Sequence, residues 1–174
     1  MLLALDCSTV ATGFSFGGPK DGSPKGGVWR LPGAEDHVFP MTCGRLARSI
    51  MDLCKMLKVE HVAIEKPIIA MGAKNAAHTM RALLELTGAA KAAANMAGAS
   101  VSEPAIGSIR KSFIGVGNLN SAAAKAAVQA RCKQLGWAFQ DGNHADSNAL
   151  WCHAMSLRYP AWAPLQTPLF KGAA

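Results

Sequence analysis

The stretch "LALDCSTVATGFSF" (residues 3–16) predicts two short strands joined by a polar turn. The first strand covers about Leu2 to Cys7 and is apolar except at Asp6, which is typical of a central strand covered on both faces. The second strand covers Thr12 to Phe16. A carboxylate is costly to bury unless a partner such as a cation compensates its charge. Further carboxylates converging on the same point would therefore indicate a cation site.

Turn residues and apolar spacing place the other elements around this pair. The run "GGPKDGSPKGG" predicts a hairpin loop, and "VWRL" a third strand. Short buried strands are expected in "HVAIEKP" and "ASVSEPA". We expect helices over 39–59, 74–98, 106–115 and 121–136, and a last helix that carries "DGNHADSNALW". The helix over 121–136 has Ser121 as its expected N-cap and Gly136 as its stop.

These elements predict an α/β fold with one five-stranded mixed sheet, in which three antiparallel strands are followed by two parallel ones. Helices would cover both faces of the sheet. Residues 1–158 form the expected domain, and the proline-rich segment 159–174 is expected to be an irregular C-terminal tail.

The net charge, the cysteines and the lengths of the apolar runs indicate which partner and which cellular compartment to expect. The net charge of +7 over 174 residues favours a polyanionic partner and argues against a cationic ligand. The five cysteines show no CxxC spacing, which predicts free thiols in a reducing compartment. No apolar run approaches the roughly 18 residues of a membrane span, and no signal peptide precedes the first strand. We expect a cytoplasmic protein with no membrane association.

Acidic residues stand at the ends of several expected elements, although the chain has only 11 of them. Glu65 lies near the end of a core strand, as Asp6 does, and the pair Asp141 and Asp146 leads into the last helix. We expect Asp146 in the first helical turn, where the helix dipole favours an anion. Together these acids predict a shared Mg²⁺ or Mn²⁺ site. Two such ions roughly 4 Å apart would suit phosphodiester hydrolysis.

The order of these motifs resembles that of the RuvC-like Holliday junction resolvases of the RNase H-like superfamily, and the phage and prophage form most of all. The matching segments are the strand–Asp–Ser/Thr–strand start, "VAIEKP", "GAKNAAHTMRALLELTGAAKAAANMAG", "PAIGSIRKSFIGVGN", "AAAKAAVQARCKQLGW" and "DGNHADSNALW". The resemblance covers roughly residues 1–158. It implies a homodimer that cuts branched DNA, because a four-way junction offers two equivalent strands related by a two-fold axis. Water would attack in line and leave a 5′-phosphate and a 3′-hydroxyl.

Carried over by position, the resemblance implies that Asp6, Glu65 and Asp146 bind two Mg²⁺ or Mn²⁺ ions in each active site. The family has a fourth acid or histidine three residues before its last Asp, where this sequence has Asn143. An amide oxygen is a weaker ligand than a carboxylate, so the fourth ligand stays open between Asp141, Asn143 and His144. Ser147 and Asn148 also replace small or apolar residues of the family.

Basic residues in the matching segments are the expected contacts to DNA phosphates, and one lysine is a candidate for transition-state stabilisation. They are Lys66, Lys74, Arg81, Arg110, Lys111 and Lys125. The resemblance also implies a role for the apolar residues after Glu65 (Ile68, Ile69 and Met71) as a wedge that parts the strands near the crossover.

Three other functions are compatible with parts of this pattern. "DCSTVATGF" resembles the phosphate-binding start of sugar kinases and actin-like ATPases, but those proteins need a second, repeated domain for which 174 residues leave no room. A non-catalytic junction-binding protein would result if Asn143 marks a degraded site. A related nuclease could act on RNA or on RNA–DNA hybrids, because the RNase H-like core serves both substrates.

Overall fold

The computed structural model describes residues 1–33, 35, 37–68 and 76–162. Its strands are β1 (Leu2–Asp6), β2 (Ala11–Gly17), β3 (Lys25–Arg30), β4 (His61–Ile64) and β5 (Ser100–Ser102). Its helices are α1 (Phe39–Leu57), α2 (Ala76–Met96), α3 (Ile106–Ile114), α4 (Ser121–Leu135) and α5 (Gly142–Arg158). The part of the chain so described contains no helix that is both long enough and apolar enough to cross a membrane.

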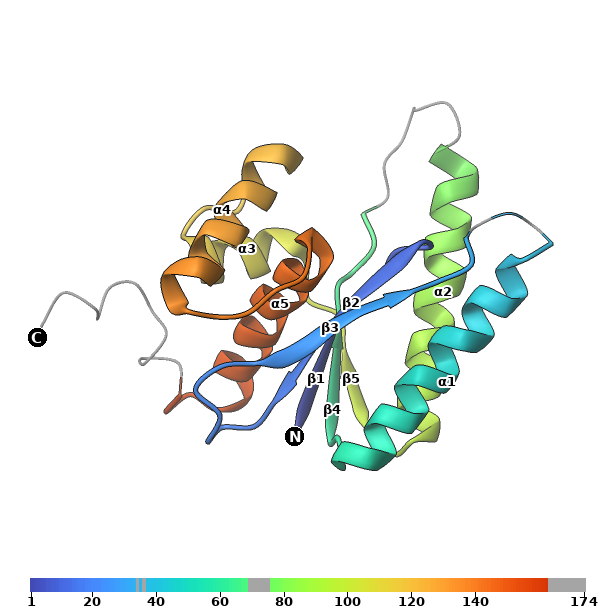
Figure 1. Cartoon of the computed structure of the whole chain (residues 1–174), viewed down its shortest axis with the longest axis horizontal. Coiled ribbons are helices and arrows are strands. Elements are labelled where there is room, and N and C mark those ends of the chain that lie inside the picture. The colour runs from blue at the N-terminus through green and yellow to red at the C-terminus, as the bar shows by residue number, and fades with distance from the viewer. Residues whose placement is uncertain (34, 36, 69–75, 163–174) are drawn as a thin grey trace, which may run out of the picture.

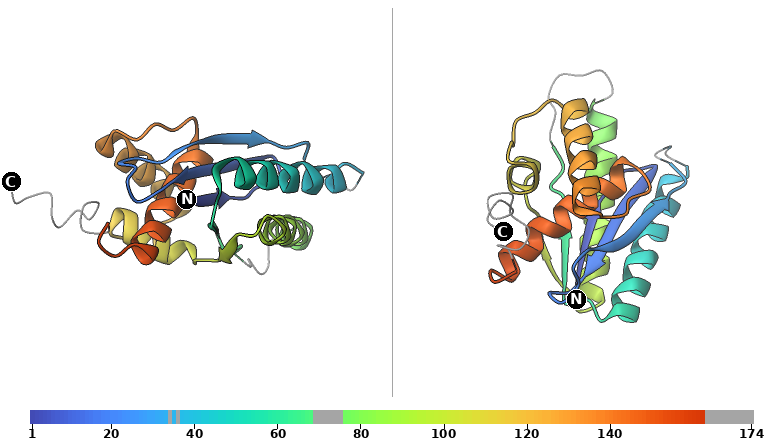
Figure 2. Two further views of the ribbon diagram at one scale, coloured as in Figure 1. Left: turned by 90° about the horizontal axis from the view of Figure 1, so that it is seen from below. Right: turned by 60° about the vertical axis from the view of Figure 1, so that its left-hand side comes forward.

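The five strands form one sheet in the order β3-β2-β1-β4-β5. The β1–β2 and β2–β3 pairs are antiparallel, whereas β1–β4 and β4–β5 are parallel. Helices α1 and α2 cover one face; on the other face α5 packs against the strands, and α3 and α4 pack against α5 (Figures 1 and 2). The expected mixed α/β sheet is therefore confirmed, including its three antiparallel and two parallel strands.

Successive side chains of each strand point to opposite faces of the sheet, so the core has two layers, one on each face. Leu3 and Leu5 of β1 pack with α1 and α2, whereas Leu2 and Ala4 pack with α3 and α5. This alternation places Asp6, the last residue of β1, on the same face as Leu2 and Ala4. The site therefore begins beneath α5, at the end of the central strand.

Several element boundaries differ from those expected. β3 begins at Lys25 rather than Val28, because Gly26 and Gly27 pair with Ser15 and Phe14 of β2. The expected N-cap Ser121 was wrong: the side chain of Asn120 accepts the Ala123 backbone N–H at 2.9 Å, and Ser121 is the first helical residue. Gly136 ends α4 as expected, with a left-handed φ of 71°.

The first residues beyond α5 still belong to the folded core. Trp162 is buried, and its ring meets the Trp151 ring edge-on with centroids 5.2 Å apart. The packed unit therefore reaches at least to residue 162, four residues past the expected boundary at 158. Residues 163–174 of the expected tail lie outside the described part of the chain.

Candidate functional site: a carboxylate cluster at the end of β1 and β4

Asp6 and Glu65 lie side by side because they follow matched positions on neighbouring parallel strands. The register pairs Leu5 of β1 with Ile64 of β4, and the Glu65 backbone N–H donates to the Leu5 carbonyl at 3.1 Å. Asp6 is thus the last residue of its strand and Glu65 is the first beyond its own. The carboxyl ends of adjacent parallel strands meet at one edge, which is where α/β folds build their sites.

Helix α5 brings two further carboxylates to this edge. Asp141 is its N-cap, and its Oδ1 accepts the His144 backbone N–H at 3.0 Å. Asp146 lies in the second turn, so its expected placement in the first turn was wrong. The first-turn preference for an anion is met by Asp141 instead. The position of Asp146 therefore needs an explanation other than the helix dipole.

The carboxylates act on one another through a poorly solvated environment. Burial, followed by the charges of Glu65 and Asp146, holds the pKa of Asp6 well above its usual range. Burial and the Asp146 carboxylate raise the pKa of Glu65 from 4.5 to about 7. The pKa of Asp146 is also raised, first by burial, and Asp141 adds to the rise. The structure thus gathers all four sequence-predicted acids into one electrostatic unit.

This donor set suits a hard divalent cation. No hydrogen bond or salt bridge to another described residue satisfies the side chains of Asp6, Glu65 and Asp146. Partly buried carboxylates without donors, and with raised pKa values, are what a cation would stabilise in their ionised form. Within the described residues, however, no three His, Cys, Asp or Glu side chains are close enough to enclose an ion as they stand. Metal binding therefore remains a prediction.

The three candidates for a fourth ligand differ in which of their side-chain atoms already form hydrogen bonds. The Asn143 side-chain amide donates to the Ala11 carbonyl of β2 at 2.9 Å, which leaves its oxygen without a partner among the described residues. His144 Nδ1 accepts the Gln140 backbone N–H at 3.1 Å, so Nε2 carries the proton of the neutral ring. That buried Nε2 has no hydrogen-bond partner among the residues that the structure describes, and it lies toward Gly26 of β3. Asp141 and Asn143 thus keep an oxygen available, whereas both nitrogens of His144 are directed elsewhere.

Two of the six predicted DNA-contacting side chains face the carboxylates. Lys125 of α4 lowers the pKa values of Asp6, Glu65 and Asp146, and Arg110 of α3 lowers those of the latter two. Lys125 Nζ also lies beside Gly142, at the start of α5. These two cations therefore offset part of the negative charge.

Three of the other four predicted contacts lie within the described residues, and none of these three is among the charges that shift the pKa values of the acids. Lys66 follows Glu65 and is exposed, as is Lys111 on α3. Arg81 forms a salt bridge with Glu85 one turn along α2, at 3.4 Å. Lys74 lies outside the described residues, as do Ile69 and Met71 of the suggested wedge. Ile68, the remaining wedge residue, is 61% exposed.

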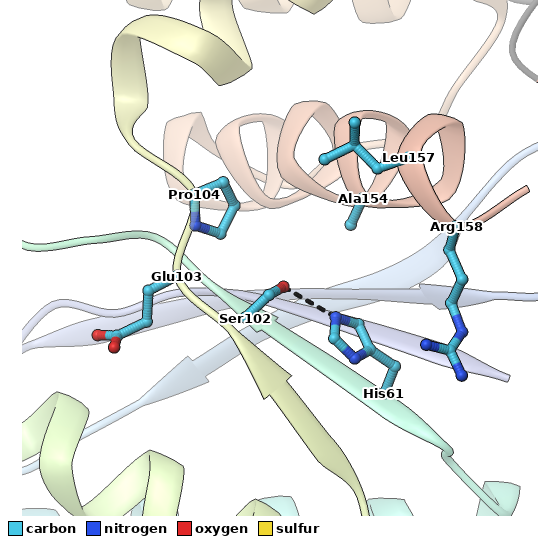
Figure 3. A pocket seen from close by; sticks show the side chains of 7 residues that line it. All are labelled: His61, Ser102, Glu103, Pro104, Ala154, Leu157 and Arg158. Atoms are coloured by element: carbon cyan, nitrogen blue, oxygen red, sulfur yellow. Dashed lines mark hydrogen bonds between the residues drawn. The ribbon is translucent and has the colours of Figure 1, made fainter. Parts of the chain in front are cut away.

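Two hollows lie near β4, and the smaller one is lined by Asp6 and Glu65. A hollow of about 210 Å³ is lined by Asp6, Cys7, Glu65, Lys66, Pro67, Ile68, Leu83 and Thr87. A larger one, of about 420 Å³, lies between α5 and the strands β4 and β5 (Figure 3). This larger hollow lies at the opposite end of β4 from Glu65, because its His61 is the first residue of that strand. Ser100 and Ser102 each bond one ring nitrogen of His61 at 2.8 Å. His61 therefore serves the pairing of the two strands, and we assign the chemistry to the smaller hollow.

The residues that hold α5 against the sheet had no predicted role. A Cβ at Gly13 would collide with the backbone carbonyl of Asn143, so only glycine fits beneath the start of the helix. Ser147 and Asn148 are fully buried and bond to Ser15 of β2. The available signal was the alternation in "GFSFG" (residues 13–17), whose small residues all point to one face of the strand.

Strand order, strand directions and helix placement together define an RNase H-like fold. The solved structure of Thermus thermophilus RuvC superposes with a TM-score of 0.66 at 19% identity, covering 91% of this chain and 96% of that one. The structure of T. thermophilus RuvC in complex with a Holliday junction substrate gives a TM-score of 0.68 at 16% identity, with the same coverage of both chains. The yeast mitochondrial Holliday junction resolvase Ydc2 gives 0.58 at 14% identity, covering 94% of this chain and 83% of that one. The sequence matches no protein-family model and no curated protein. The chain therefore has the fold of RuvC.

Proposed function

We propose that this chain is a metal-dependent endonuclease that resolves branched DNA, above all four-way junctions. One observation carries the proposal: Asp6 and Glu65 lie side by side at the ends of β1 and β4, and α5 brings Asp146 close enough for its charge to raise the pKa of both. The likeness to a RuvC structure that contains a Holliday junction substrate supports the choice of DNA. The net charge of +7 is also in keeping with a polyanionic substrate.

The proposed roles follow from where each side chain lies. Asp6, Glu65 and Asp146 would hold Mg²⁺ or Mn²⁺, with the free oxygens of Asp141 and Asn143 as further donors. Two cations bound there would supply an activated water and stabilisation of the leaving oxygen. Lys125 and Arg110 would bind the phosphate that spans the cluster. Exposed Lys66 and Lys111 would contact phosphates farther along the strand, and exposed Ile68 would pack against bases at the crossover.

Three parts of this proposal rest on the sequence and on the symmetry of the substrate. A homodimer would present two clusters to the two equivalent strands of a junction. A phage or prophage origin rests on the sequence resemblance alone, because the similar structures come from T. thermophilus and yeast mitochondria. A cytoplasmic location is in keeping with cysteines that are all free thiols.

Cleavage of a synthetic four-way junction labelled on each strand tests the proposal. We expect paired nicks at symmetric positions with Mg²⁺ or Mn²⁺, and at least a 100-fold slower reaction for Asp6→Asn, because loss of a charge-stabilising group costs about 10²–10³-fold. Asp52→Asn is the matched control, since Asp52 is exposed on α1, on the other face of the sheet. It should cleave like wild type.

The same assay separates the alternatives. Tight junction binding without nicks in either metal would contradict the proposal and favour a non-catalytic junction-binding protein. Preferential cleavage of an RNA–DNA hybrid over the junction would favour an RNase H-like activity instead. Linear duplex DNA of equal length provides the reference for structure-selective cleavage.

A further inference from the structure

A chain of buried hydrogen bonds joins α5 to the middle of β2. Ser15, Ser147 and Asn148 are each fully buried. The Ser15 hydroxyl donates to Asn148 Oδ1 at 2.7 Å and lies 2.6 Å from the Ser147 hydroxyl oxygen. The Asn148 side-chain amide in turn donates to the Ala138 carbonyl at 3.1 Å, in the segment between α4 and α5.

The partners around Asn148 fix which of its side-chain atoms faces Ser15. Because the Asn148 amide nitrogen donates to the Ala138 carbonyl, its oxygen faces Ser15 and accepts the Ser15 hydroxyl. The hydroxyls of Ser15 and Ser147 are also within hydrogen-bond distance, and either of them can be the donor. The Ser147 hydroxyl also donates to the His144 carbonyl at 2.8 Å. Ser15 is thus the residue of β2 that bonds both Ser147 and Asn148 of α5.

Close packing on either side of Ser15 leaves the helix little room to slide. A Cβ at Gly13 would collide with the Asn143 carbonyl, and one at Gly17 would lie 2.7 Å from Cζ2 of Trp151. At the start of the helix, the Asn143 amide donates to the Ala11 carbonyl of the same strand at 2.9 Å. Directional hydrogen bonds fix one register, whereas apolar contacts alone tolerate several. The register of α5 is therefore set along β2.

The position of α5 along β2 affects the distance between the carboxylates, because β2 also pairs with β1, the strand that carries Asp6. Gly13 pairs with Asp6 across the β1–β2 ladder, and Asp146 directly precedes Ser147 on α5. We propose that Ser15 is a positioning residue, which through Ser147 and Asn148 holds α5 at the register that sets Asp146 opposite Asp6. The inference rests on the proposed function, since it assigns Ser15 a role in binding the metal that Asp6 and Asp146 would share.

Mn²⁺ binding provides a test that does not depend on cleavage. Free Mn²⁺ is counted by electron paramagnetic resonance for wild type, Ser15→Ala and Thr42→Val. Thr42 is the matched control: it is fully buried in α1, on the other face of the sheet, and its hydroxyl donates to the Gly33 carbonyl at 2.8 Å. Loss of a group that orients a metal ligand weakens metal binding about 10–100-fold. We expect at least a 10-fold loss for Ser15→Ala and none for Thr42→Val.

Kinetics on the junction give the second readout. Ser15→Ala should lower kcat and leave KM for the junction unchanged, because Ser15 is fully buried and offers no atom to DNA. Ser147→Ala keeps the bond between Ser15 and Asn148, so it should lose only a few-fold in Mn²⁺ affinity. This milder variant keeps the test decisive if Ser15→Ala does not fold.

The outcomes separate the positioning role from the function itself. Wild-type Mn²⁺ binding with equal affinities for Ser15→Ala, Ser147→Ala and Thr42→Val would overturn the role of Ser15 and leave the nuclease intact. Failure of the wild-type protein to bind Mn²⁺ and to cut junctions would overturn the proposed function. A graded loss, with Ser15→Ala the weaker binder and Ser147→Ala between it and wild type, is the result that supports the positioning role.

Discussion

At the scale of single residues, the site is defined by carboxylates whose pKa values are raised in the folded state. Glu65 has a pKa of about 7 rather than 4.5, first because it is buried and then because Asp146 is close. The folded state therefore holds a proton that the unfolded chain releases between these two pH values. The contribution of Glu65 to the free energy of unfolding is therefore fully present below pH 4.5 and is lost as the pH rises to about 7. A salt-bridged carboxylate, whose pKa is lowered on folding, behaves in the opposite way.

We expect the metal-free protein to lose stability as the pH rises from about 5 to about 8. The contribution of Glu65 is at most about 3–4 kcal/mol, because its pKa rises from 4.5 to about 7 and one pKa unit corresponds to roughly 1.4 kcal/mol. Asp6 contributes in the same direction, since its pKa is also raised. Urea unfolding in EDTA at a series of pH values measures the slope. Added Mn²⁺ should stabilise the protein more at pH 8 than at pH 5.

Glu65→Gln is the control for this assignment, because glutamine keeps the shape of the side chain and does not titrate. The variant should show a flatter pH profile than wild type. Its Asp6 should also titrate lower, since the Glu65 charge is one cause of the raised pKa of Asp6. A wild-type profile that rises between pH 5 and pH 8 would contradict the raised pKa values.

At the scale of elements, the position of α5 depends on the absence of a side chain at Gly13. The Asn143 carbonyl occupies the space that a Cβ would need, and backbone atoms cannot turn aside as a flexible side chain can. The helix would have to move away from β2, taking Asp146 with it. Gly13 is therefore a requirement of the site as well as of the packing.

Gly13→Ala should destabilise the protein by about 1–3 kcal/mol, the usual cost of overpacking, and should also slow junction cleavage. Gly44→Ala is the control, because a Cβ at Gly44 of α1 meets no atom within 4 Å. That change should stabilise the helix by about 0.5–1 kcal/mol. Urea unfolding compares the two. Equal stability of Gly13→Ala and wild type would show that α5 has room to move.

At the scale of the whole molecule, one chain presents a single carboxylate cluster, whereas a four-way junction has two equivalent strands to cut. We expect a homodimer, with a mass near 36 kDa by light scattering, since one chain is 18.2 kDa. Nicks on the two strands should be coupled in time. A monomeric mass at the concentration of the cleavage assay, together with uncoupled nicks, would contradict this prediction.

The strand pattern was predictable because alternation and turn residues are local properties. The hydrophobic stretch around Asp6 indicated a central strand, and β1 does pair on both sides. Boundaries were less predictable where pairing decides them, as at Gly26 and Gly27, which read as loop residues but join β3. A residue with low strand propensity is drawn into a sheet when its neighbours supply the hydrogen bonds.

The class of fold and the clustered acids could be predicted from the sequence, because strands and their ends follow from the local pattern of apolar, polar and turn residues. The surroundings of those acids could not be predicted, because they depend on tertiary contacts. Folding placed His144 Nε2 beside Gly26 of β3, bonded Asn143 to Ala11 of β2, and buried Ser147 and Asn148 against Ser15. The reason is physical: these contacts join residues more than a hundred positions apart, and their geometry depends on how closely a helix can approach a strand that carries glycine.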